Sequence, residues 1–136
     1  MNEEKLNSIL DSGASCSQVI LLYFAEHFKT SEDELKEIGI AFEAGNFQAK
    51  TCGCVTGSYI VLGKLFSNDK LLLKQKLIQF TEKFTKKNSS VICSELLDSD
   101  ISQPENLAKA FESGKIEKVC PQAIKSSIEI IEELLN

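Results

Sequence analysis

The sequence predicts an all-α protein, a single compact domain over residues 1–136 with six or seven helices and two buried apolar helices at its centre. Apolar residues recur at three- and four-residue intervals along most of the chain, which is the spacing of one helix face. No segment has the two-residue alternation of a half-buried strand. The length also suits one domain, because a domain of this size buries roughly two-thirds of the surface that its unfolded chain exposes.

The first part of the chain predicts three helices. Residues 3–10 form a short one, and residues 15–28 form a second that is apolar on almost every side and should therefore be buried. Ser31 followed by Glu34 matches a capping box, which predicts the start of a third helix. A loop over 45–51 is expected to follow it.

Two central segments are expected to carry most of the core. Residues 52–66 are strongly apolar, and Gly53 and Gly57 near their start would let a neighbouring backbone approach closely. Residues 69–87 form an amphipathic helix that begins at the capping residue Asp69. The core-facing side of this helix is expected to carry Leu73, Leu77, Phe80 and Phe84.

The last third of the chain predicts a short helix over 90–97, a surface helix between Pro104 and Gly114, and a final helix over 121–135. Proline suits the first turn of a helix and glycine its end. The final helix is therefore expected to begin at Pro121. Its inward face should carry Ile124, Ile128, Ile131 and Leu135.

Composition and charge exclude several classes of function. The net charge is -5 and the 15 basic residues are scattered, so nucleic-acid binding is not expected. No apolar run approaches the roughly 18 residues of a membrane span, and no secretory signal is visible at the N-terminus. We therefore expect a cytoplasmic protein without membrane insertion. In a reducing cytosol, cysteines stay as thiols unless they are catalytic, redox-sensing or metal-bound.

The five cysteines are the most informative residues, because four of them stand where a helix is expected to begin: Cys16, Cys52, Cys93 and Cys120. A helix N-terminus carries unpaired N–H groups and a partial positive charge, which favours thiolate over thiol. The fifth, Cys54, is expected to be a packing residue, since free cysteine behaves as a small buried hydrophobe. The other four cysteines point to sulfur chemistry at one end of the fold.

The segment 52–57 reads C-G-C-V-T-G and has single cysteines at wide spacing before and after it. This pattern resembles the C_GCAxxG_C_C family, which is named for its cysteine signature and for an expected redox activity. The resemblance covers nearly the whole chain. It implies that the family's functional positions fall on Cys16, Cys52, Gly53, Gly57, Cys93 and Cys120.

Two features depart from the family pattern. Cys54 stands in place of the motif alanine, which gives the chain an extra thiol. Of the glycine-rich loop that precedes the motif in the family, only Gly45 remains. The resemblance also implies a functional link to a transporter, besides a redox partner protein that the sequence does not identify.

In the first functional hypothesis, two cysteines cycle between dithiol and disulfide, which would make the chain a thiol-disulfide oxidoreductase. Cys52 is the expected attacking thiolate, and Cys16, Cys93 or Cys120 would resolve the mixed disulfide. Cys54 is a poor partner for Cys52, because residues two apart on a helix point to different sides. This hypothesis requires no cofactor.

Two other classes of function stay open. Four thiolates are the ligand count of an iron–sulfur cluster for electron transfer, or of a structural zinc ion, and the ligands would be Cys16, Cys52, Cys93 and Cys120. Zinc is the less favoured of the two, because zinc sites usually draw their ligands from closely spaced pairs. Alternatively, the chain is a non-catalytic helical adaptor with structural cysteines, whose acidic final helix binds a partner.

Overall fold

The computed structural model describes residues 1–136 and is all-α, as the sequence predicts. It contains eight α-helices rather than the predicted six or seven, and each of the eight segments that the sequence marks as helical contains one. The helices are α1 (Glu3–Asp11), α2 (Cys16–Tyr23), α3 (Glu32–Gly39), α4 (Gly53–Phe66), α5 (Lys70–Asn88), α6 (Cys93–Leu96), α7 (Pro104–Glu112) and α8 (Lys115–Leu134).

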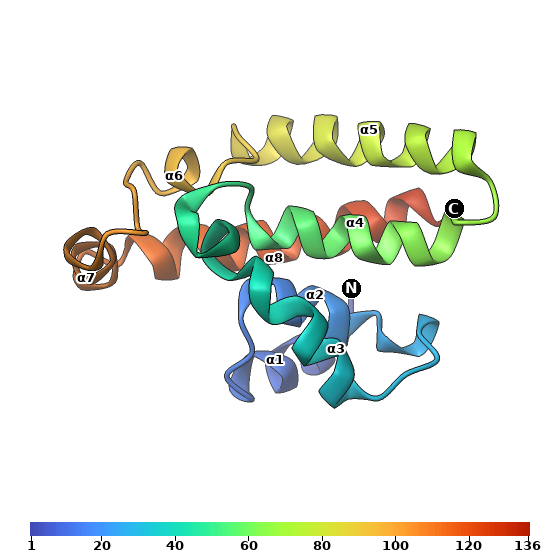
Figure 1. The fold of residues 1–136 in the computed structure, drawn as a ribbon, viewed down its shortest axis with the longest axis horizontal. Coiled ribbons are helices and arrows are strands. Elements are labelled where there is room, and N and C mark those ends of the chain that lie inside the picture. The colour runs from blue at the N-terminus through green and yellow to red at the C-terminus, as the bar shows by residue number, and fades with distance from the viewer.

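Three long helices, α4, α5 and α8, run side by side and form one layer of the molecule (Figure 1). Helices α1, α2 and α3 form a second group, in which α2 packs closely on α4 and α3 covers α2. The short helices α6 and α7 lie at one end of the long layer (Figure 1). No helix is both long enough and apolar enough to cross a bilayer.

The main core lies between α2, α4, α5 and α8. Helix α2 buries six of its eight residues, including Ile20 and Leu21, and α4 buries Val55, Val61 and Leu62. Phe80 and Phe84 of α5 are fully buried and stack on each other with ring centroids 5.8 Å apart. A second, smaller core lies at the α6–α7 end and consists of Ala49, Cys93, Leu97, Ile101 and Ala110.

The helix predicted over 15–28 is shorter than expected. Helix α2 ends at Tyr23, and a single turn of 3₁₀-helix over Ala25–His27 follows. At the junction, Phe24 leaves the helical region with φ −102° and ψ 22°. The apolar pattern therefore continues past the end of the helix, because Phe24 is itself buried in the main core.

The prediction that the final helix begins at residue 121 is wrong. Helix α8 begins at Lys115, so Pro121 lies inside it. Proline inside a helix removes one backbone hydrogen bond and crowds the preceding turn. The earlier start is favoured by burial, because Ile116 and Val119 pack against the second core. Gly114, with φ +77°, turns the chain sharply from α7 into α8.

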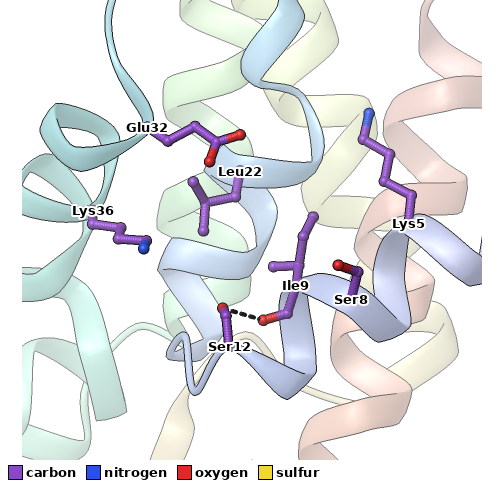
Figure 2. Close-up of a pocket in the computed structure, with 7 residues that line it drawn as sticks. All are labelled: Lys5, Ser8, Ile9, Ser12, Leu22, Glu32 and Lys36. Atoms are coloured by element: carbon purple, nitrogen blue, oxygen red, sulfur yellow. Dashed lines mark hydrogen bonds between the residues drawn. The ribbon is translucent and has the colours of Figure 1, made fainter.

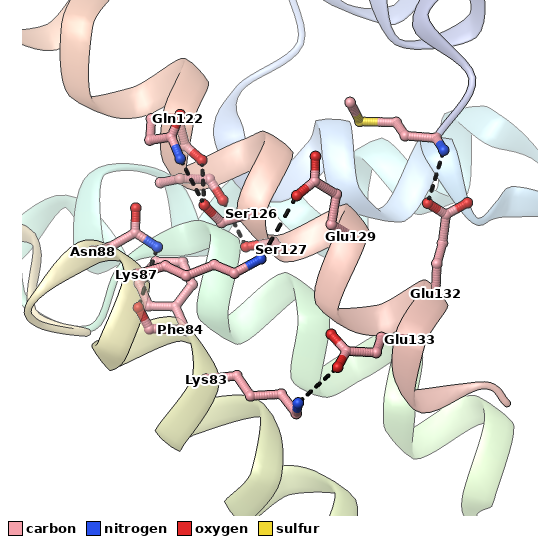
Figure 3. Close-up of polar contacts among 12 residues, drawn as sticks. Lys83, Phe84, Lys87, Asn88, Gln122, Ser126, Ser127, Glu129, Glu132 and Glu133 are labelled. Carbon is pink, nitrogen blue, oxygen red and sulfur yellow. Dashed lines mark hydrogen bonds and ion pairs between the residues drawn. The ribbon is translucent and has the colours of Figure 1, made fainter.

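Ion pairs join the acidic face of α8 to other parts of the chain (Figure 3). Their partners and N–O separations are Lys83 with Glu133 at 2.8 Å, Lys87 with Glu129 at 3.7 Å, and the N-terminal amine of Met1 with Glu132 at 3.4 Å. Such partly exposed pairs contribute about 0–1 kcal/mol each. Glu129, Glu132 and Glu133 of the final helix are thus each paired within the chain.

Candidate functional site

Three cysteines meet where α2 and α4 begin. Cys16 is the first residue of α2, Cys52 directly precedes α4, and Cys54 is the second residue of α4. The start of α2 is fixed by a capping box, in which the side chain of Gln18 accepts a hydrogen bond of 3.0 Å from the backbone N–H of Ser15. All three cysteines belong to the main core or pack directly against it.

Gly53 lets the two helix starts approach each other. A Cβ atom built on Gly53 would lie 2.5 Å from the sulfur of Cys16 and 2.7 Å from the carbonyl oxygen of Phe42. The sulfur of Cys16 therefore rests on the backbone of the residue between Cys52 and Cys54. Four residues later, a Cβ atom on Gly57 would lie 3.1 Å from the carbonyl oxygen of Ser17. Both glycines thus face the first turn of α2.

The pKa of Cys16 is lowered from 9.0 to about 7. The largest cause is a hydrogen bond from the Cys54 thiol, and the backbone N–H groups of Ala44 and Ser17 act in the same direction. Burial and the negative charge of Glu43 oppose this shift. A substantial fraction of Cys16 is therefore thiolate at neutral pH, which is the reactive form of cysteine.

Cys52 and Cys54 shift in opposite directions. Hydrogen bonding from the Cys54 thiol is the largest cause that lowers the pKa of Cys52, and the N–H groups of Cys54 and Val55 add to it. Burial and the charge of Cys16 oppose the shift at Cys52. The pKa of Cys54 is raised well above its usual value, because its proton serves the other two sulfurs. The trio thus holds one thiol donor and two sulfur acceptors.

The chain before Cys52 winds through a left-handed turn instead of the simple loop that the sequence predicts. Five residues have positive φ angles: Ala44 (51°), Gly45 (65°), Asn46 (62°), Phe47 (57°) and Ala49 (53°). This conformation costs residues other than glycine and asparagine roughly 1–2 kcal/mol each. It places the N–H of Ala44 against Cys16. Gly45 is obligatory, since a Cβ atom there would lie 2.3 Å from the backbone nitrogen of Lys50.

A short antiparallel bridge between Thr51 and Ile92 joins the segment before α4 to the segment before α6, and so places Cys93 near Cys52. The N–H of Cys52 donates to the carbonyl of Val91 at 2.8 Å, and the N–H of Cys93 donates to the carbonyl of Lys50 at 2.6 Å. In such an antiparallel pairing, Cys52 and Cys93 are diagonal neighbours on the same side, which ordinarily places their Cβ atoms within about 8 Å. Burial is the main cause that raises the pKa of Cys93 to about 12, so its thiol stays neutral.

Cys120 does not stand at a helix start. It lies inside α8, after the first turn, and packs against the second core rather than the main one. Burial is again the main cause that raises its pKa to about 12, and the charges of Cys16 and Cys52 add to the shift. The helix terminus that the sequence assigned to this thiol is therefore absent. Of the four signature cysteines, only Cys16 and Cys52 are activated towards the thiolate.

The side chains of Cys, His, Asp and Glu form no group of three or more that is arranged to hold a metal ion. A zinc ion or an iron–sulfur cluster on Cys16, Cys52, Cys93 and Cys120 therefore receives no support from the donor geometry, and no step is derived through such a group. Away from the cysteines, a cavity of about 300 Å³ lies between α1 and α3 (Figure 2). Lys5, Glu32 and Lys36 line it, and no cysteine does.

Sequence reasoning missed the part that Cys54 plays in this site. The sequence shows this cysteine at the second position of an apolar helix, where a cysteine is most simply interpreted as a packing residue. Cys54 is indeed only 1% exposed. Its hydrogen bonds to Cys16 and Cys52 depend on the packing of α2 on α4, which no local pattern reports.

Comparison with known proteins assigns the chain to a family. The model of the family described as "Putative redox-active protein (C_GCAxxG_C_C)" matches residues 14–134, so the chain belongs to this family. No curated protein and no solved structure matches the chain. The description of the family supports redox activity in general and leaves the chemistry of this site to be argued from its residues.

Proposed function

We propose that this member of the C_GCAxxG_C_C family carries out thiol–disulfide exchange, with Cys16 and Cys52 as the reacting pair. One observation carries the proposal: the sulfur of Cys16 rests on Gly53, the residue directly after Cys52, so the packing of the two helix starts brings these two cysteines together. The pKa shifts agree with this pairing, because the pKa values of Cys16 and Cys52 are lowered, whereas those of Cys93 and Cys120 are raised to about 12. A thiol with a pKa near the ambient pH is the best attacking group, because it combines thiolate population with nucleophilicity.

The reaction has two balanced steps. The Cys16 thiolate attacks one sulfur of an external disulfide, RS–SR′, so that a Cys16–SR bond forms, the S–S bond breaks and R′S⁻ leaves. The Cys52 thiolate then attacks the sulfur of Cys16, a Cys16–Cys52 disulfide forms and RS⁻ leaves. Two electrons pass from the cysteine pair to the external disulfide, which is released as two thiols. The reverse reaction with an external dithiol restores the pair.

Burial supports Cys16 rather than Cys52 as the attacking group. Cys52, which the sequence favoured as the nucleophile, is 8% exposed, whereas Cys16 is only partly buried. A bulky disulfide reaches the more exposed sulfur first. Cys52 then acts from the helix start beside it, and the backbone bridge holds Cys93 next to Cys52.

The external disulfide belongs to a redox partner, either a protein or a small thiol compound. The thiol–disulfide pair of such a partner exchanges with the site in both directions, so its redox potential decides whether the chain acts as a reductant or an oxidant. The link to a transporter remains a prediction of the family resemblance.

Thiol counting on protein purified without oxygen tests the proposal. We expect colourless, metal-free protein that loses two thiols on mild oxidation with oxidised glutathione and regains both with a dithiol. Peptide mapping should place the disulfide between Cys16 and Cys52. Cys16→Ser and Cys52→Ser should each abolish the reversible loss, whereas Cys120→Ser, in the second core, should keep it. Iron with sulfide, stoichiometric zinc, or unchanged cycling in Cys16→Ser would overturn the assignment.

A further inference from the structure

The chain between α3 and α4 forms a loop whose two ends meet at the sulfur of Cys16. A Cβ atom on Gly53, the first residue of α4, would lie 2.7 Å from the carbonyl oxygen of Phe42 and 2.5 Å from this sulfur. The loop thus leaves the site at Phe42 and returns to it at Cys52. In Figure 1 it curls at the start of α4, beside α6. Compact surface loops with adjoining ends frequently carry function.

Large apolar side chains are exposed along this loop and directly before it. Of the eight large hydrophobic side chains that the fold leaves exposed, three fall within residues 38–47: Ile38 at 42%, Ile40 at 43% and Phe47 at 54%. The other five are spread over the rest of the chain. Ile40 and Phe47 lie in two segments that pack on each other, Ile40–Phe42 and Gly45–Ala49. Exposed apolar side chains that gather in one place mark a surface that binds another molecule.

Phe47 has a backbone conformation that bulky residues avoid, with φ 57° and ψ 16°. A hydrogen bond of 3.0 Å from the N–H of Lys50 to the carbonyl of Gly45 closes the turn around it. The folded chain gains little from the Phe47 side chain in return, because the ring is more than half exposed and packs against neither core. Strained residues of this kind cluster where a protein binds or reacts.

We propose that Ile40 and Phe47 form a docking surface for a protein substrate, whose disulfide is flanked by apolar side chains. This inference rests on the proposed function and names the class of external disulfide that the site accepts. The chemistry of exchange decides what covers the surface. A sulfur of the substrate has to reach the sulfur of Cys16, which lies at the point where the loop begins and ends.

The reach of the loop suits a protein better than a small disulfide. Phe47 is five residues from Phe42 and five from Cys52. An extended chain spans at most about 3.6 Å per residue, so Phe47 lies within roughly 18 Å of both ends of the loop. A typical protein partner covers about 800 Å², a patch roughly 30 Å across, which is wide enough to include Phe47 when it is centred on Cys16. Oxidised glutathione has no large apolar side chain to place there.

The test uses two short peptide disulfides of equal length and charge. One has leucine and phenylalanine on both sides of its cysteine, and the other has serine at the same places. The rate of exchange with reduced protein is measured by the release of peptide thiol. We expect the apolar peptide to react about tenfold faster than the polar one with the parent chain, and this ratio to fall to about one in Phe47→Asn. Asparagine adopts the left-handed conformation readily, so the variant keeps the loop.

Phe111→Asn is the matched control, because Phe111 is 56% exposed and lies on α7, outside the loop. It should keep the tenfold ratio, and so should Phe47→Tyr, which retains the ring. The reactivity of the sulfur itself is measured separately, as the pH midpoint for alkylation of Cys16 by iodoacetamide on reduced protein, with alkylated peptides counted by mass spectrometry. This midpoint should lie near pH 7 in the parent chain and in Phe47→Asn.

The outcomes separate this inference from the proposed function. If the parent chain exchanges with neither oxidised glutathione nor the peptides, the proposed function fails. If it exchanges with both peptides equally fast, or if Phe47→Asn keeps the ratio, only the docking surface fails. The docking surface also fails if Phe111→Asn lowers the ratio as much, or if Phe47→Asn shifts the alkylation midpoint of Cys16. A parent dimer that Phe47→Asn dissociates in analytical ultracentrifugation would show that the surface binds a second copy instead.

Discussion

The sulfur of Cys16 and the backbone of Gly53 are in direct contact: a Cβ atom on Gly53 would lie 2.5 Å from that sulfur. This contact joins the start of α2 to the start of α4 and leaves no room for any side chain between them. The glycine of the motif is therefore a packing requirement at the reactive sulfur. Because Cys52 and Cys54 are the residues on either side of Gly53, the same contact places the backbone of both against the start of α2.

Gly53→Ala should destabilise the protein and disturb the site together. The added methyl group must displace the sulfur of Cys16 or the carbonyl of Phe42, and overpacking of this kind costs about 1–3 kcal/mol. We expect the free energy of unfolding in urea to fall by that amount and the alkylation midpoint of Cys16 to rise. Gly63→Ala is the matched control in the same helix, because nothing lies within 4 Å of its Cβ position. It should stabilise the protein by about 1 kcal/mol. Equal effects at the two glycines would contradict the packing argument.

The helices of this fold were largely predictable because most of them carry their own signals. Helices α3 and α5 each begin at the residue after a capping side chain, Ser31 and Asp69. Each of these side chains accepts a hydrogen bond from a backbone N–H in the first turn of its helix. The start of α8 was missed for the opposite reason. Its first turn carries no capping side chain, and the proline that suggested a start lies inside the helix, where tertiary burial outweighs the local preference.

Stability should depend on pH through Cys16 with a definite sign. The folded-state pKa of about 7 lies below the unfolded value of 9.0, so the stability that Cys16 contributes is fully present above pH 9 and is lost as pH falls through 7. At most about 1.4 kcal/mol is gained per pH unit between these limits. The difference in unfolding free energy between the parent chain and Cys16→Ser, measured under a reductant, should therefore grow from pH 7 to pH 9. A constant difference would show that the thiolate is not favoured in the folded state.

Cys120 should show the opposite dependence. Its pKa is raised to about 12 by burial, so the unfolded chain releases this proton more readily than the folded one. The stability that its neutral thiol contributes is present below pH 9 and is lost as pH rises towards 12. The parent chain should therefore lose stability between pH 9 and pH 11 relative to Cys120→Ala. Urea unfolding at several pH values checks this, and a parent chain that gained on the variant over this range would refute it.

The left-handed turn before Cys52 should contain removable strain. Ala44 has φ 51°, a conformation that glycine adopts freely, so Ala44→Gly should raise the unfolding free energy by about 1 kcal/mol. The backbone N–H that acts on Cys16 is retained, so its alkylation midpoint should not change. Ala108→Gly, at an exposed position inside α7, is the control and should cost about 1 kcal/mol. Destabilisation of similar size at both positions would mean that Ala44 is not strained.

The candidate site was less predictable than the fold. The positions of Cys16, Cys52 and Cys93 at or next to helix starts follow from local sequence signals. The effect of the Cys54 thiol on the pKa values of Cys16 and Cys52 depends on how α2 packs on α4. Local sequence patterns do not report the packing of one helix on another. The backbone of the segment from Ala44 to Ala49 could not be predicted either, because three of its five positive φ angles belong to alanine or phenylalanine, which usually avoid them.

Pro121→Ala should stabilise the protein, because Pro121 interrupts α8 without a compensating contact of its own. Its side chain is exposed, and its ring removes the hydrogen bond that a backbone N–H at this position would donate to the carbonyl of Glu117. Alanine restores that bond and relieves the crowding, so the unfolding free energy should rise by about 1–3 kcal/mol. Lys118→Ala, also exposed in α8, is the control and should change stability by no more than about 0.5 kcal/mol. The N-terminal part of α8 carries Cys120, so a firmer helix should also slow alkylation of this thiol at alkaline pH. A loss of stability in Pro121→Ala would instead mean that the second core needs a bend at this proline.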